Sequence, residues 1–153
     1  DFREIATEFT DDFFDDMNRL GVMKPDIVTY VSDYVNDIIQ FIEKILENKM
    51  GYESNGSVYI DMIKYYELHN KDILFDTLTF ADNIISQLDE HLLSEKKDPR
   101  DFALWKKAKE GEPSWKSPWG EGRPAWHIEC SVMIEDTLKI FPSTNKLFII
   151  HTG

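Results

Sequence analysis

Apolar residues recur at three- and four-residue spacing in four segments of the chain, which is the pattern of amphipathic helices. We expect helices over residues 2–20, 32–48, 78–93 and 128–138. Gly21 suits the end of the first helix, and Ser32 or Asp33 can cap the second. Carboxylates cluster away from the apolar face of the first helix, and a solvated face explains them better than a cation site.

Two other segments have the pattern of strands. Residues 52–60 place Asn55-Gly56 between β-forming residues, which predicts a hairpin with a type I′ turn. Residues 147–150 are continuously apolar, as expected of a parallel strand buried on both faces. In open α/β sheets, ligands bind at the carboxyl ends of such strands. The predicted fold class is therefore α/β.

Residues 111–124 break both patterns. They hold three Gly, three Pro and two Trp, so we expect neither a regular helix nor a central strand. Long loops with apolar anchors are often functional, and a packed connector fits the composition equally well.

Composition narrows the class of protein. The chain has 153 residues, of which 42% are hydrophobic and 30% charged, which suits one globular domain. A net charge of −12 argues against a stand-alone nucleic-acid binder. No apolar run approaches the roughly 20 residues of a membrane span, and the start does not have the pattern of a signal peptide. A single cysteine excludes an internal disulfide and favours a reducing compartment. Without an initiator Met, and with an abrupt stop at His151-Thr152-Gly153, the chain is expected to be part of something longer.

The charge is unevenly distributed. Residues 1–93 carry a net charge of −13, whereas residues 94–126 carry +2 and hold all four tryptophans. This places the expected chemistry in the second half. Six cations form a modest basic cluster that could meet phosphate, although a solvated face interleaved with Asp98 and Asp101 explains it better. They are Lys96, Lys97, Arg100, Lys106, Lys107 and Lys109.

Cys130 is the only thiol, and it is predicted to lie in the first turn of a helix. The helix dipole and free amides there favour a thiolate, which binds zinc or attacks carbonyls. Spacing alone nevertheless favours an inert packing role, and no Cys-x-x-Cys partner exists. His127 precedes Cys130 by about one helical turn, so the two could share a face. His127 and His151 are candidate ligands or bases, although lone histidines are more often ordinary surface or core groups.

A long run of residues resembles the cysteinyl-tRNA synthetase family. It comprises Asp101 to Lys106, Gly111 to Trp115, Ser117 to Gly120, Gly122 to Pro124, and the stretch Trp126-His127-Ile128-Glu129-Cys130-Ser131. Weaker similarity covers residues 20–26 and the hairpin. Residues 150–153 resemble the start of the family's Ile-His-x-Gly-Gly motif, which includes His151 and Gly153.

This resemblance implies a cytoplasmic class I ligase that activates cysteine with ATP and Mg²⁺ and transfers it to tRNA(Cys), without membrane association. It implies a Zn²⁺ ion that holds the substrate thiolate, with Cys130 as one ligand. It assigns Trp126 and His127 to substrate binding and Glu129, His151 and Gly153 to support of the motif, and it assigns no catalytic residue here. The other zinc ligands and the ATP motifs would lie outside this chain.

The resemblance also implies a domain plan. Residues 1–125 would form the connective insertion and flanking helices, and 126–153 would begin the second half of an incomplete Rossmann-like catalytic domain. The helix-rich inserted subdomain would contain the hairpin. Ala125 stands where the family usually has Gly, so an ordinary φ is expected there. With one zinc ligand and an uncovered apolar surface, the piece alone is expected to be inactive and prone to self-association.

Two alternatives remain open. A cysteine ligase of mycothiol biosynthesis shares the Trp-His-Ile-Glu-Cys motif but uses a sugar amine as acceptor. A non-catalytic helical interaction module would contain the same residues merely as core.

Overall fold

The computed structural model describes residues 1–68 and 94–140. The helix predicted over 78–93 and the strand predicted over 147–150 lie outside the described residues. The chain divides into two compact units, Asp1–Tyr30 and Val31–Gly153, and each is described by itself.

The first unit is built on helix α1, Phe2–Arg19, which confirms the helix predicted over 2–20. The Asp1 side chain accepts a hydrogen bond from the Arg3 amide at 3.2 Å and caps the first turn. Gly21 follows the helix with a φ of +74°, a left-handed conformation that glycine adopts without strain. No residue of α1 is buried.

The second unit begins with a 3₁₀ turn, Val31–Asp33, that leads into helix α2, Val35–Glu47. The helix predicted over 32–48 is therefore confirmed, but it starts three residues later. The prediction that Ser32 or Asp33 caps it is wrong, because the 3₁₀ turn takes up both residues. Tyr34 occupies the N-cap position, and its side chain makes no capping hydrogen bond to the helix.

The predicted hairpin is confirmed as strands β1, Gly51–Ser54, and β2, Ser57–Ile60. Asn55 and Gly56 have φ angles of +51° and +81°, as a type I′ turn requires. The short helix α3, Met62–Leu68, follows directly.

The hairpin belongs to a five-stranded sheet in the order β1-β2-β3-β5-β4, with every described neighbour pair antiparallel. Strand β3 spans Ala103–Lys107, β4 spans Trp115–Ser117 and β5 spans Gly120–Pro124. The expectation that residues 111–124 hold no central strand is wrong, since β5 lies between β3 and β4.

Local sterics explain how a segment so rich in Gly and Pro enters the sheet. Pro118 lies in the turn between β4 and β5, and Pro124 is the last residue of β5. A Cβ atom at Gly122 would collide with Trp105 Nε1 and the Lys106 carbonyl, so only glycine lets the Trp105 indole lie against this strand. The segment's tryptophans do act as anchors, because Trp115 and Trp119 both pack against the core.

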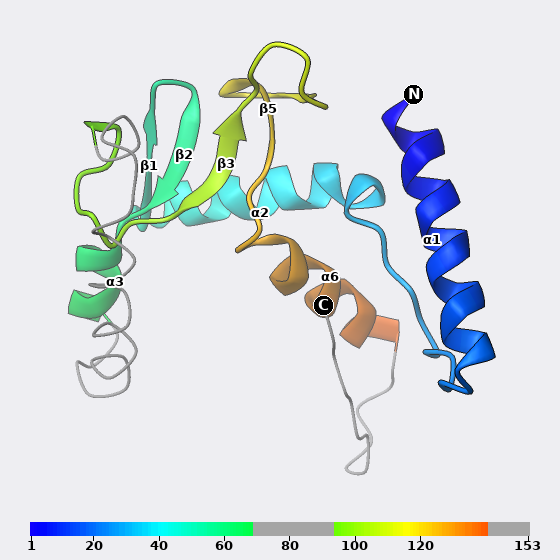
Figure 1. Ribbon diagram of the computed structural model, residues 1–153. Helices are drawn as coiled ribbons and strands as arrows, with labels where there is room; N and C mark the ends of the chain where they lie inside the picture. Colours follow the sequence, from blue (N-terminus) through cyan, green and yellow to red (C-terminus); the bar gives the residue numbers. More distant parts are fainter. Residues whose placement is uncertain (69–93, 141–153) are drawn as a thin grey trace, which may run out of the picture. The chain divides into compact units, whose positions relative to one another are not determined.

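Helix α2 packs against the sheet, and helix α6, Glu129–Ile140, packs beside α2 (Figure 1). Helix α6 confirms the helix predicted over 128–138. The main core joins residues of both helices to β2 and β3: Val35, Ile38, Ile42, Val58, Leu104, Trp105, Ile128 and Val132. The predicted α/β class is confirmed at the level of helices packed with an antiparallel sheet.

Candidate functional site

The Trp126-to-Cys130 stretch forms the corner at which the chain leaves the sheet and enters α6. The Ala125 amide donates to the Leu104 carbonyl at 3.0 Å, which extends the pairing of β5 with β3 by one residue. The amides of His127 and Ile128 then both donate to the Ala125 carbonyl, at 2.6 and 3.2 Å. Ala125 is buried and has no positive φ, as predicted. The corner is therefore held by the backbone and by buried neighbours on both sides.

Trp126 projects outward from this corner, with 84% of its surface exposed. Exposure of so large an aromatic ring is costly unless a ligand or another part of the protein covers it. Its neighbours Ala125 and Ile128 are buried, so the fold holds the backbone of Trp126 while leaving its indole available.

His127 lies before the first residue of α6, so the helical spacing that suggested a shared face with Cys130 does not apply. Its ring instead packs against Phe102, with 4.8 Å between ring centroids. Burial lowers the pKa of His127, and the positive charges of Lys106 and Lys96 lower it further. The neutral imidazole, which both donates and accepts hydrogen bonds, is favoured at this position.

Glu129 and Cys130 occupy the first turn of α6, as predicted for Cys130. Burial raises the pKa of Glu129, while the charge of Arg123 opposes that rise. Cys130 is a free, partly buried thiol. Within residues 1–68 and 94–140, no group of three or more His, Cys, Asp or Glu side chains is placed to hold a metal ion.

An apolar cleft of about 470 Å³ opens beside the corner. Five lining residues come from β3 and the residue before it, from the turn after Trp126 and from the start of α6: Phe102, Leu104, His127, Ile128 and Ser131. Residues from α2, β2 and α3 complete the lining: Phe41, Ile45, Ile60, Met62 and Tyr65. The cleft can take an apolar group, with His127 and Ser131 as its polar contacts.

A buried carboxylate holds the segment just before β3, which carries Phe102. Asp101, only 1% exposed, accepts hydrogen bonds from the Tyr52 hydroxyl at 2.6 Å, the Met62 amide at 2.9 Å and the Asp98 amide at 3.0 Å. The interpretation of Asp101 as part of a solvated face is therefore wrong, because three donors compensate its burial. Asp101 ties β1, the start of α3 and the segment before β3 together.

The structure brings Trp126, His127, Glu129 and Cys130 to one corner, while His151 and Gly153 lie outside the described residues. Sequence reasoning gave no role to Phe102, Ser131 or Arg123, which the fold places around that corner. The contact of Phe102 with His127 joins residues that are far apart in the chain, and no local signal could reveal it.

Comparisons with a family model and with known proteins all indicate the same family. A family model described as tRNA synthetases class I (C) catalytic domain matches residues 1–153. A cysteine–tRNA ligase of Encephalitozoon cuniculi is 45% identical over 135 residues, covering 88% of this chain and 27% of that protein. Proteins named cytoplasmic cysteine–tRNA ligase are 44% identical over 140 residues in Dictyostelium discoideum and 45% identical over 140 residues in Homo sapiens. They cover 88% and 86% of this chain.

The chain spans between about a fifth and a quarter of the length of these relatives, at 27%, 21% and 19%. None of the helices in the described part of the chain is both long and apolar enough to cross a bilayer.

Proposed function

This chain belongs to the family of class I (C) tRNA synthetase catalytic domains, and we propose that the protein it forms part of is a cytoplasmic cysteine–tRNA ligase. The match of the family model over all of residues 1–153 carries the proposal. The relatives named above are cysteine–tRNA ligases, which favours a tRNA acceptor over the sugar amine of mycothiol biosynthesis.

The proposed reaction has two steps. A carboxylate oxygen of cysteine attacks the α-phosphorus of Mg²⁺-bound ATP, and the bond to pyrophosphate breaks, giving cysteinyl-adenylate. A ribose hydroxyl at the 3′ end of tRNA(Cys) then attacks the carbonyl carbon, and AMP leaves. Such a reaction depends mainly on positioning and charge stabilisation.

The residues of the Trp126–Cys130 corner would position the cysteine substrate. Trp126 would lie against the bound cysteine, since its exposed indole is fixed at the backbone. His127 would orient the substrate as a neutral hydrogen-bonding group, with Phe102 behind its ring. Glu129 would support the first turn of α6.

The family implies a zinc ion, and the side chains at and around Cys130 show how much of a zinc site this chain can supply. Cys130 is chemically suited to be one zinc ligand, being an accessible soft donor at a helix start. The described residues do not supply a second and third ligand around it. We therefore propose that Cys130 joins ligands from elsewhere in the full-length protein. A bound zinc would supply selectivity for a thiolate over the serine hydroxyl.

The domain plan is part of the same proposal. Residues 1–125 would form the connective insertion with flanking helices, and 126–153 would begin the second half of a Rossmann-like fold. In that plan the β1–β2 hairpin would belong to the insertion, and His151 and Gly153 would be support residues of the family motif at the end of 126–153.

The test uses the full-length protein with Cys130→Ala. We expect zinc content, measured by mass spectrometry, to fall by at least half, and cysteine-dependent ATP–pyrophosphate exchange to fall more than about a hundredfold, because one of four ligands is lost. Thr137→Ala is the matched control on the same helix, since its hydroxyl donates a hydrogen bond to the Met133 carbonyl one turn earlier in α6.

Unchanged zinc content and exchange in Cys130→Ala would favour the non-catalytic module over a ligase that uses this thiol. Charging of a sugar amine instead of tRNA by the wild-type protein would identify the mycothiol ligase.

A further inference from the structure

Two of the six cations of the basic cluster have acidic partners within the protein. The Arg100 guanidinium makes two hydrogen bonds to the Asp98 carboxylate, at 2.7 and 2.9 Å. Lys97 Nζ lies 4.2 Å from the centre of the Tyr52 ring and 3.9 Å from Asp61 Oδ2. Contacts within the protein therefore neutralise the charges of Arg100 and Lys97.

Lys96 and Lys106 differ from that pair. Within the described residues, neither takes part in an ion pair, which is also true of Lys107 and Lys109. Lys96 and Lys106 are distinguished by their positions close to each other and to His127. Burial lowers the pKa of Lys96, and the charge of Lys106 lowers it further, although the nearby carboxylate of Asp101 opposes this. That carboxylate already accepts three hydrogen bonds. The fold thus holds two lysines near each other and near His127, where their charges repel.

Strand geometry extends the positive surface. Lys106 on β3 is directly opposite Arg123 on β5, and residues that face each other across a strand pair project to the same side. Like charges in this relation destabilise a sheet. Glu112 Oε2 lies 3.6 Å from Arg123 Nε and neutralises part of the charge of Arg123. A second anion near Lys106 would relieve the remaining repulsion.

The surroundings favour a polymeric anion. Residues 94–126 are net positive in a chain whose net charge is −12, so a polyanion would be repelled elsewhere and concentrated here. Lys106 is exposed on an open strand surface, which suits an extended phosphate backbone better than a small nucleotide that must be enclosed.

We propose that the lysine patch, Lys96 and Lys106, contacts backbone phosphates of the tRNA that the enzyme charges. This inference rests on the proposed function and assigns a substrate-binding surface next to the Trp126–Cys130 corner. The contacts would be insensitive to sequence, because phosphates carry no base information.

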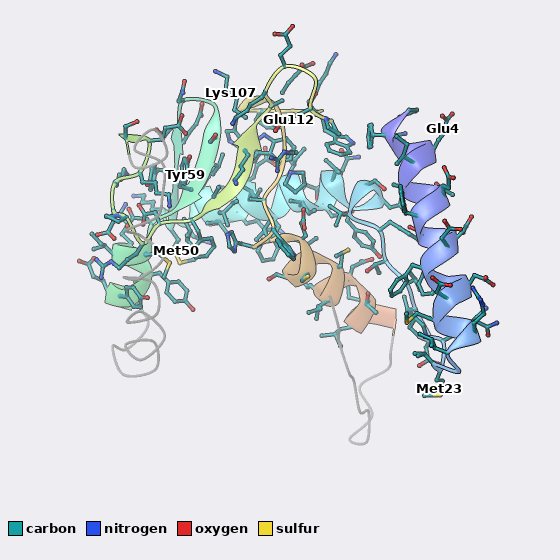
Figure 2. All side chains as sticks on the ribbon, viewed as in Figure 1. Glu4, Met23, Met50, Tyr59, Lys107 and Glu112 are labelled. Atoms are coloured by element: carbon teal, nitrogen blue, oxygen red, sulfur yellow. The ribbon has the colours of Figure 1, made fainter. Side chains whose placement is uncertain are left out.

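The experiment measures binding of the tRNA(Cys) transcript to the full-length protein between 50 and 200 mM salt. We expect Lys96→Ala and Lys106→Ala each to raise the Kd severalfold at low salt. Each should also reduce the slope of log K against log salt by about 0.7–0.9, the share of one phosphate contact. Lys107→Ala is the matched control, because Lys107 is the adjacent exposed lysine of β3 (Figure 2). Successive residues of a strand project to opposite faces, so Lys107 does not share the face of Lys106.

Cysteine-dependent ATP–pyrophosphate exchange, which needs no tRNA, separates the two proposals. At about pH 8, where an imidazole is neutral even without nearby lysine charges, we expect exchange and the KM for ATP to stay within twofold of wild type in both lysine variants. An unchanged Kd and salt slope, or a rise in the KM for ATP instead, would overturn the patch as an RNA contact. Absence of exchange in the wild-type protein would refute the proposed function, while the salt slopes would still report on the patch.

Discussion

Helices α1 and α2 have similar amphipathic sequences, but only α2 has buried side chains. Both carry apolar residues at three- and four-residue spacing, with charged residues on the other side. Val35, Ile38 and Ile42 of α2 are buried in the core, and the last two are fully inaccessible. In α1, by contrast, Phe9 is 68% exposed and no residue is buried.

This difference separates two kinds of information in an amphipathic pattern. The pattern specifies a helix and the face that gains from burial. It does not specify what covers that face, because the covering residues belong to other elements. For α2 they are supplied by the sheet and α6, and burial of its side chains stabilises the second unit.

The largest effect is expected at the centre of α2. Ile42→Ala should lower the free energy of unfolding of the 1–153 chain by about 2–5 kcal/mol, because it leaves a cavity in a fully buried site. Urea denaturation followed by circular dichroism measures the change. Lys44→Ala, on the exposed side of the same helix, should stay within about 0.5 kcal/mol. Equal effects of the two variants would mean that α2 does not pack as described.

An intermediate effect is expected at the buried carboxylate. Asp101→Asn should cost about 1–3 kcal/mol, because one amide oxygen cannot replace two carboxylate oxygens that accept three hydrogen bonds. The same urea titration measures it. Asp37→Asn on the exposed surface of α2 serves as the control. A cost no larger than that of Asp37→Asn would show that Asp101 does not tie the hairpin to β3.

The smallest effect is expected on α1. Phe9→Ala should change the free energy of unfolding of the 1–153 chain by less than about 0.5 kcal/mol, because the exposed ring loses little burial. The same substitution in the full-length protein then reports whether other parts of the protein cover this face. A decrease of more than about 1 kcal/mol in the free energy of unfolding of the 1–153 chain would show that Phe9 is buried, as the core residues of α2 are.

The structure confirms the sequence-based predictions that rest on local physics. Asn55-Gly56 requires no partner to form its turn, and Gly21 requires none to end α1. The prediction for residues 111–124 was wrong because composition alone marks Gly and Pro as strand breakers. Only the Trp105 indole, packed against Gly122 from a neighbouring strand, turns that glycine into a requirement of β5.

The candidate site also combines features that local sequence predicts with features that depend on tertiary contacts. The position of Cys130 at a helix start followed from the pattern of α6. The packing of Phe102 against His127 and the hydrogen bonds from Tyr52 and Met62 to Asp101 join residues separated by 25 or more positions. Such contacts depend on which strands pair and in what register, which a local pattern does not encode.

The sequence by itself determined the helices α1, α2 and α6, the hairpin turn and the Trp126–Cys130 motif, because backbone preferences and side-chain periodicity act over a few residues. Tertiary structure alone decided the placement of β5 inside the sheet, the burial of Asp101 and the pairing of Lys97 with Asp61. The physical reason is that burial and charge neutralisation depend on partners that the chain brings together only when it folds.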